Sequence, residues 1–240
     1  MKAIGKNASQ MRELMKLFIT PELFEVNYKT LATLFHIPFF TYSKDQALFK
    51  ADKFKAGLKE VYGNQQMENL PIKTSLQVTD METGRGQILS TGNFADAIYA
   101  SSAISPFFPP ILIDGRWIAD GGFSSNLPLL HAVSQGIDII IAMDFGCKVK
   151  GQATDYLSYF NMFLAQGNAE NIHHKNSLAL DLHHYEIIFS EVEFDSPVAM
   201  WDTEAIPTVS RQGKKTVEAI KDQITQAIEL FPLTKENKTF

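Results

Sequence analysis

The sequence has little cysteine, no long apolar run and no excess of positive charge, and each shortage excludes a class of protein. Its 240 residues contain one cysteine, Cys147, so the chain cannot form an internal disulfide. No apolar segment approaches the length of a membrane-spanning helix, and the first ten residues, MKAIGKNASQ, lack the apolar centre of a signal peptide. A net charge of −5 offers no basic surface, so we expect no nucleic-acid partner.

The remaining composition is that of an ordinary globular protein. Hydrophobic residues make up 45% of the chain, and its length suits one α/β domain. A single cysteine fits a reducing compartment. We therefore expect a cytoplasmic protein, with export by a route that needs no classical signal peptide left open.

Three zones divide the expected single domain over residues 1–240. Residues 1–70 are expected to be mainly helical, because apolar residues recur at helical spacing, and Asn7 with Gln10 has the pattern of a capping box. Residues 71–146 are expected to hold the core strands. Residues 147–240 are expected to form C-terminal helices with one or more strands.

The strand signals favour an α/β fold. Residues 72–78 alternate apolar and polar, whereas 137–143 form an apolar run interrupted only by Asp138, typical of a parallel strand buried on both faces. Asp114-Gly115 between two apolar runs predicts a hairpin. A further strand is expected over 185–189, and an amphipathic helix over 208–230. We predict a mostly parallel central sheet flanked by helices.

Other helices are expected over 23–35, from Asn93 as N-cap through Ala103, and over 154–180 with a break near Gly167. Ser124 and Ser125 are expected to cap the helix that begins at Leu127.

Asp120, Gly121 and Gly122 form the strongest candidate site. The acid stands on two glycines, after the predicted hairpin and before a predicted helix. Glycine lets the backbone turn sharply and approach another group closely, so the carboxylate would be held on a stiff turn, as catalytic carboxylates usually are. The alternative is a simple turn whose aspartate bonds its own backbone, because Asp-Gly is common in turns.

The surroundings favour the catalytic interpretation. Residues 79–145 carry a series of short motifs that, in this order, resembles the C-terminal part of the patatin-like phospholipase family, and such a series is more specific than any one motif. The resemblance implies a patatin-like α/β fold and hydrolysis of lipid acyl esters by a Ser-Asp dyad. Asp120 would be the aspartate of the dyad, with Gly121 and Gly122 supporting it. The matching positions are Thr79-Asp80, Thr83-Gly84, Ala100 to Ile104, Phe108-Pro109-Pro110, Asp114-Gly115-Arg116, Asp120-Gly121-Gly122, Asn126-Leu127-Pro128 and Gly136-Ile137-Asp138, with a weaker likeness over 4–14.

The other half of the dyad is not in the sequence. In the family, the serine lies in a G-x-S-x-G elbow, yet only Ser124 has a glycine two positions before it, and Asn126 stands where the second glycine would be. No run of three glycines offers an oxyanion loop either. Because a serine needs both an activating base and oxyanion donors, we expect no lipid hydrolysis by these 240 residues alone.

The resemblance therefore implies a chain truncated before the end of the nucleophile helix, without the first strands of the sheet. A full-length parent is expected to be a lipid acyl-ester hydrolase. The alternative is an inactive pseudoenzyme that binds a lipid or a protein partner. Strands left without their neighbours keep unpaired edges, so we expect self-association through them.

Other features support weaker hypotheses. Phe107 and Phe108 could line an acyl-binding groove or belong to the core, and both interpretations stay open. The pairs His173-His174 and His183-His184 are interpreted as solvated surface, so no metal and no cofactor is expected. The terminal helix could contact a membrane surface, although core packing is the favoured interpretation.

Overall fold

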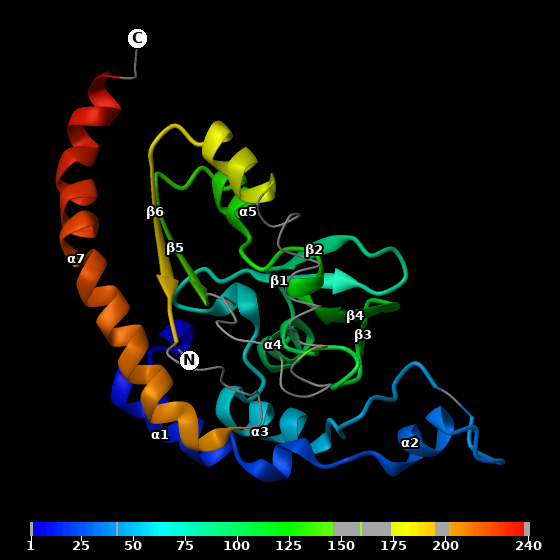
Figure 1. The fold of residues 1–240 in the computed structure, drawn as a ribbon. Helices are drawn as coiled ribbons and strands as arrows, with labels where there is room; N and C mark the ends of the chain where they lie inside the picture. The colour runs from blue at the N-terminus through cyan, green and yellow to red at the C-terminus, as the bar shows by residue number, and fades with distance from the viewer. Residues whose placement is uncertain (1, 42, 146–158, 160–173, 195–201, 238–240) are drawn as a thin grey trace. The chain divides into compact units, whose positions relative to one another are not determined.

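A computed structural model describes residues 2–41, 43–145, 159, 174–194 and 202–237 (Figure 1). Contacts along the chain divide it into two compact units. The first unit contains residues 1–124 and 200–203, and the second contains 125–199 and 204–240. The expectation of one domain over residues 1–240 stays a prediction.

Helices dominate the beginning of the first unit. The capping box at Asn7 and Gln10 is confirmed: each residue's backbone N–H donates to the other's side-chain oxygen, at 3.0 and 2.9 Å. The stretch 23–35, expected to be one helix, is interrupted because Val26 forms an antiparallel bridge with Phe49. The elements are η1 (Lys2–Ile4), α1 (Ala8–Phe18), η2 (Pro21–Phe24), α2 (Tyr28–Leu34), α3 (Asp52–Tyr62) and η3 (Met67–Asn69).

A four-stranded antiparallel sheet follows, in the order β2-β1-β4-β3. The predicted hairpin at Asp114-Gly115 is confirmed; both residues have positive φ, 48° and 76°, as a type I′ turn requires. Asn93 caps the helix beside the sheet, its side chain accepting from the Asp96 N–H at 3.0 Å. The elements are β1 (Leu76–Asp80), β2 (Gly86–Leu89), α4 (Phe94–Ser101), β3 (Ile111–Ile113), β4 (Arg116–Asp120) and η4 (Gly121–Phe123).

The second unit is built on a parallel strand pair. β5 (Ile139–Phe145) runs beside β6 (Glu186–Val192), α5 (Leu129–Ser134) precedes β5, and α7 (Ile206–Asn237) packs along β6. η5 (Thr203–Ala205) leads into α7. Most of the helix expected over 154–180 lies outside the described residues, although 174–182 are helical.

The α/β class is confirmed, but the strand directions are mixed rather than mostly parallel. Short hairpin connections make β1 antiparallel to β2 and β3 antiparallel to β4, and β1 also pairs antiparallel with β4. Among the described strands, only β5 and β6 are parallel. The apolar run of β5 is covered on one face only. Ile140 and Ala142 are buried, whereas Ile141 and Phe145 are 48% and 60% exposed.

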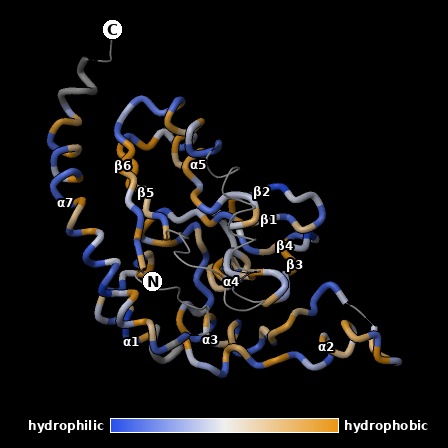
Figure 2. Tube along the Cα trace, in the orientation of Figure 1, coloured by the Kyte–Doolittle hydropathy of each residue, from blue (hydrophilic) through white to orange (hydrophobic). Residues whose placement is uncertain are grey.

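The core of the first unit lies between α4, α3 and the antiparallel sheet. Tyr99 is fully buried, and its hydroxyl donates to the Pro109 carbonyl at 2.7 Å. Figure 2 shows apolar and polar residues alternating along α7, and apolar residues on α2 and on the chain that follows it. Among the helices that the structure describes, none is both long and apolar enough to cross a bilayer.

Candidate functional site

Asp120 ends β4 and caps η4, so a strand end and a tight turn fix its backbone. Its N–H donates to the Ala103 carbonyl at 3.1 Å, and its own carbonyl accepts from the Thr79 hydroxyl at 2.8 Å. Its position is further set by strand pairing, because Val78 of β1 stands opposite it in the register. The main chain of Asp120 is therefore held from both sides, as a residue that presents a catalytic group should be.

The Asp120 carboxyl is anchored at one oxygen and open at the other. Oδ1 accepts from the Gly122 N–H at 2.6 Å. Within the described residues, no group donates a hydrogen bond to Oδ2. Burial raises the pKa of this carboxyl above its ordinary value, and the Gly122 N–H opposes part of that rise. A part-buried carboxylate with a raised pKa and one open oxygen is suited to accept a proton.

Gly121 is required because β1 passes directly against it. A Cβ at this position would lie 2.2 Å from the Gln77 carbonyl oxygen and 2.6 Å from its carbon, distances that real Cβ atoms do not adopt. These contacts are with backbone, so rotation of a side chain could not relieve them. The first glycine of the predicted motif thus allows two backbones to approach each other, and the position of Asp120 depends on that approach.

A buried polar network lies beneath the turn. Ser124 Oγ donates to the Gly121 carbonyl at 3.1 Å, lies 2.9 Å from Thr79 Oγ1, and accepts from Gln77 Nε2 at 3.1 Å. Thr79 and Ser124 are 4% and 7% exposed. Buried hydroxyls that are all hydrogen-bonded make a turn rigid, since any movement leaves a polar group unsatisfied. This network connects β1 to the Asp120 turn.

Asp80 is a buried carboxylate, 3% exposed, to which the sequence analysis assigned no role. It accepts from the backbone N–H groups of Glu82 and Thr83 at 2.9 and 3.1 Å and from Gln87 Nε2 at 3.3 Å, and it lies 3.6 Å from Arg116 Nη1. The N–H groups of Thr83 and then Glu82 hold its pKa below the ordinary value. Asp80 closes the β1–β2 turn. An aspartate just before a turn is the signal that could have revealed this.

Phe107 and Phe108 lie together in an aromatic cluster. They are 5% and 4% exposed, and the Phe49 ring contacts both, with centroids 6.0 and 5.7 Å away. Phe108 also contacts Phe54 at 5.2 Å. This is the packing of core residues, which the sequence left open beside the acyl-groove interpretation.

The serines near the motif have structural partners. Ser101 donates to the Gln77 carbonyl at 2.9 Å, and Ser125 donates to the Leu127 carbonyl at 3.0 Å. The sequence predicted that Ser124 would cap the helix that follows it. In the structure, Ser124 belongs to the network beneath the turn instead. None of these three hydroxyls donates to the Asp120 carboxylate in the part of the chain that the structure describes.

The histidine pairs are described only in part. His173 lies outside the described residues, and His183 Nε2 lies 3.0 Å from the Asp138 carbonyl oxygen. Among described residues, no group of three or more His, Cys, Asp or Glu side chains has the spacing to hold a metal ion.

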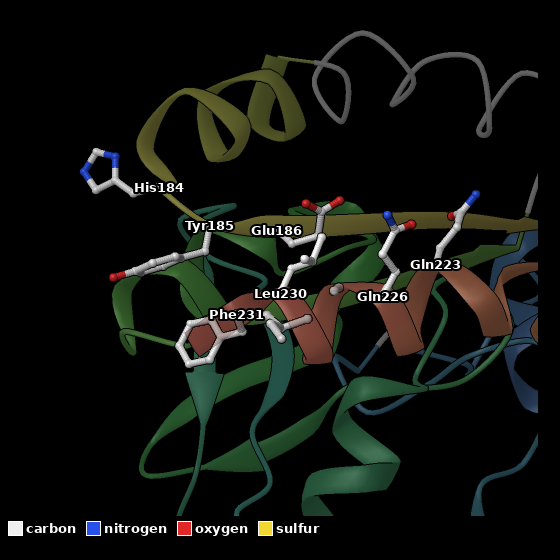
Figure 3. A pocket seen from close by; sticks show the side chains of 9 residues that line it. His184, Tyr185, Glu186, Gln223, Gln226, Leu230 and Phe231 are labelled. Carbon is white, nitrogen blue, oxygen red and sulfur yellow. The ribbon is translucent and has the colours of Figure 1, made fainter. Parts of the chain in front are cut away.

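A separate pocket of about 490 Å³ lies in the second unit, between the start of β6 and α7 (Figure 3). Tyr185 and Phe231 meet edge to face at one end, with ring centroids 5.5 Å apart. Glu186, Gln226 and Gln223 line the pocket further along. Its lining mixes polar and apolar groups and includes His184 of the second histidine pair, but none of the predicted site residues Asp120, Gly121, Gly122, Phe107 and Phe108.

Parts of this chain are similar to known proteins. A family model described as patatin-like phospholipase matches residues 1–133. The lysophospholipase NTE1 of Phaeosphaeria nodorum is 30% identical over 94 residues, covering 39% of this chain and 6% of that protein. The mouse patatin-like phospholipase domain-containing protein 7 is 27% identical over 112 residues, covering 46% of this chain and 8% of that protein.

A bacterial relative has a similar level of identity. An uncharacterised NTE family protein of Mycobacterium bovis is 31% identical over 108 residues, covering 45% of this chain and 30% of that protein. The chain thus spans at most 30% of the length of these three relatives. Because the family model matches more than half of the chain, including the Asp120 turn, the chain belongs to the patatin-like phospholipase family.

Proposed function

We propose that Asp120 is the general base of a lipid acyl-ester hydrolase, paired with a serine nucleophile that is not among these 240 residues. Membership of the patatin-like phospholipase family supports lipid hydrolysis as the class of reaction. One observation carries the assignment of the base: a part-buried carboxylate with a raised pKa, fixed at Oδ1 and open at Oδ2. The specific lipid and acyl position are not part of the proposal.

The reaction has two halves, and in each of them Asp120 accepts one proton and then returns it. The serine hydroxyl gives its proton to the carboxylate as its oxygen attacks the acyl carbon, and the carboxyl then protonates the leaving alcohol. A water molecule next gives a proton to the same carboxylate as its oxygen attacks the acyl carbon of the acyl-serine. The carbon–serine oxygen bond then breaks, and the carboxyl protonates the serine oxygen, which frees the acid and restores the serine. The raised pKa favours this role, because a stronger base accepts the proton more readily.

The proposal expects different activities from a longer protein that carries the serine and from these 240 residues alone. The sequence contains no G-x-S-x-G elbow. We therefore expect the 240-residue chain alone to show no hydrolysis of lipid esters. The alternative function is a pseudoenzyme that binds a lipid or a protein partner, and the missing elbow is the observation that favours it.

The test begins with the intact mass of the protein isolated from its own source. The 240 residues have a mass of 26.9 kDa. In a heavier protein with an elbow in its additional sequence, Asp120→Asn should lower kcat for ester hydrolysis by about a thousandfold or more. Asp114→Asn is the matched control, because Asp114 also precedes a glycine and has a positive φ that asparagine tolerates. This control should leave kcat unchanged.

Three results would contradict the proposal. An unchanged kcat in Asp120→Asn of the heavier protein would remove the assignment of the base. A native mass of 26.9 kDa would favour the pseudoenzyme. Ester hydrolysis by the 240-residue chain that disappears in Asp120→Asn would instead place the nucleophile within the chain.

A further inference from the structure

An arm, formed by residues 27–41 and 43–48, leaves the first unit and returns to the same point. Its base is closed by the antiparallel bridge between Val26 and Phe49 and by the Asn27 N–H, which donates to the Leu48 carbonyl at 2.8 Å. The Phe24 ring meets that of Phe49 edge to face at 5.6 Å. The base of the arm is thus joined to the buried aromatic cluster, which gives the arm a firm attachment.

The outer part of the arm exposes large apolar side chains. Phe35 is 77% exposed, and Phe39 is fully exposed. Folded proteins seldom leave several large apolar side chains together in water, and such groups mark interaction sites. Figure 1 shows α2 and the chain after it extending away from α3. The exposed apolar residues of the arm are Tyr28, Leu34, Phe35, Ile37, Phe39 and Phe40.

The backbone of the arm favours this presentation. His36 and Phe39 have positive φ angles of 53° and 76°, which non-glycine residues adopt at a cost. The Ile37 N–H donates to the Ala32 carbonyl at 3.0 Å, which closes the turn after α2. A bulky side chain that is fully exposed, on a residue held at positive φ, does not stabilise the folded chain. We take its position as one selected for contact with something outside the chain.

The charges on the arm indicate what that contact is. From Val26 to Lys44 there is no aspartate or glutamate, although the whole chain has a net charge of −5. The one carboxylate of the arm, Asp45, follows Lys44 on the segment that returns to the base. Lys29 and His36 are exposed, while Lys44 forms an ion pair with Glu82 at 3.0 Å. Aromatic side chains beside basic ones, with no carboxylate on the outer part of the arm, suit the headgroup region of a phospholipid layer, because phosphates attract the cations and carboxylates would be repelled.

We propose that this arm inserts its aromatic tip into the surface of a phospholipid bilayer. A fluid layer closes around a protruding side chain such as Phe39, whereas a protein partner would need a matching pocket. The choice of a lipid surface rests on the proposed function, because a lipid hydrolase must reach substrate that lies in a membrane. The arm itself needs no nucleophile, so binding can be tested on the 240-residue chain.

The first experiment measures sedimentation of the chain with vesicles of phosphatidylcholine and phosphatidylserine. The double variant Phe35→Ser with Phe39→Ser should bind roughly tenfold more weakly or worse, because it removes two exposed rings from the inserted surface. Both positions are exposed, so the fold should tolerate the change. Ile72→Ser with Met81→Ser is the matched control, since these residues are 48% and 43% exposed in the same unit outside the arm.

The second experiment distinguishes insertion from loose attraction. Phe39→Trp should add a fluorescence that shifts to the blue on vesicles and is quenched by lipids brominated in their acyl chains. The same substitution at Ile72 should show neither change. Light scattering without lipid reports whether the arm instead binds a second copy of the chain.

The proposal is overturned if the unmodified chain does not sediment with vesicles, or if Phe35→Ser with Phe39→Ser binds as well as the control. It is also overturned if the arm variant changes only the oligomeric state, or if Ile228→Ser, an exposed position on α7, abolishes binding instead. Failure here would leave Asp120 untouched, because its test is hydrolysis of ester by the native protein. Conversely, failure of Asp120→Asn to lower kcat would leave vesicle binding intact.

Discussion

Gly121 is the residue on which the geometry of the aspartate turn depends most. A methyl group at this position would meet the Gln77 backbone at 2.2 Å, so β1 or the turn would have to move. We expect Gly121→Ala to lower the free energy of unfolding by about 2 kcal/mol or more, measured by urea denaturation. The same displacement should impair hydrolysis by the native protein, because it shifts Asp120.

Gly213 provides the matched control for this prediction. It lies within α7, and a Cβ there would meet nothing within 4 Å. Gly213→Ala should therefore stabilise the chain by about 0.5–1 kcal/mol through helix propensity. Equal effects of the two alanine substitutions would show that the contact with Gln77 does not hold the turn.

Asp120 itself should make stability depend on pH. Burial raises its pKa in the folded chain, so the folded state binds this proton more tightly than the unfolded state does. The carboxyl therefore destabilises the fold increasingly as pH rises from the ordinary value of 3.8 through the raised value. Asparagine carries no charge, and its carbonyl can still accept from the Gly122 N–H.

We expect Asp120→Asn to stabilise the chain by about 0.5–2 kcal/mol at neutral pH, with the gain disappearing below the ordinary aspartate pKa. Urea denaturation of both proteins across that pH range measures the difference. A gain that is independent of pH would mean that burial of the charge is not its cause. A loss of stability at neutral pH would contradict the raised pKa.

At the scale of elements, the sequence predicted the helix caps and the hairpin turn, because these features depend on residues that are close together in the chain. The Asn7 capping box, the Asn93 cap and the Asp114-Gly115 hairpin all rest on groups within a few residues, and the structure contains each of them. The interrupted stretch 23–35 could not be predicted in this way, because Val26 pairs with Phe49 across 23 residues of sequence. The strand expected over 72–78 is displaced to Leu76–Asp80 for the same reason, since its limits follow its pairing with β2 and β4.

The candidate site also has a part that the sequence predicted and a part that it did not. The motif at Asp120 is contiguous, so the sequence alone identified it. The support beneath it is not contiguous: Thr79 Oγ1 bonds the Asp120 carbonyl from 41 residues away, and Gln77 reaches Ser124 from 47. A single sequence carries no sign of such pairs. A single sequence also does not show which apolar side chains are exposed to solvent. The apolar arm was therefore found only in the structure.

At the scale of the whole molecule, strand pairing determines how the chain should behave in solution. In the part of the chain that the structure describes, β5 pairs only with β6, so each strand has one edge with no strand beside it. Ile141, Phe145 and Phe189 on these strands are more than 40% exposed. Unpaired apolar strands invite pairing with another chain. We therefore keep the prediction that the 240-residue chain self-associates through these edges.

Light scattering over increasing concentration tests this prediction, and a charge on the strand identifies the surface. Ile141→Lys should reduce the average mass towards 26.9 kDa, because a lysine on an edge strand disfavours pairing. Ile228→Lys, at an exposed position on α7, should leave the mass unchanged. If the unmodified chain stays monomeric at high concentration, the strand edges do not mediate self-association. If Ile228→Lys is the variant that lowers the mass, α7 and not the strand pair is the contact between copies.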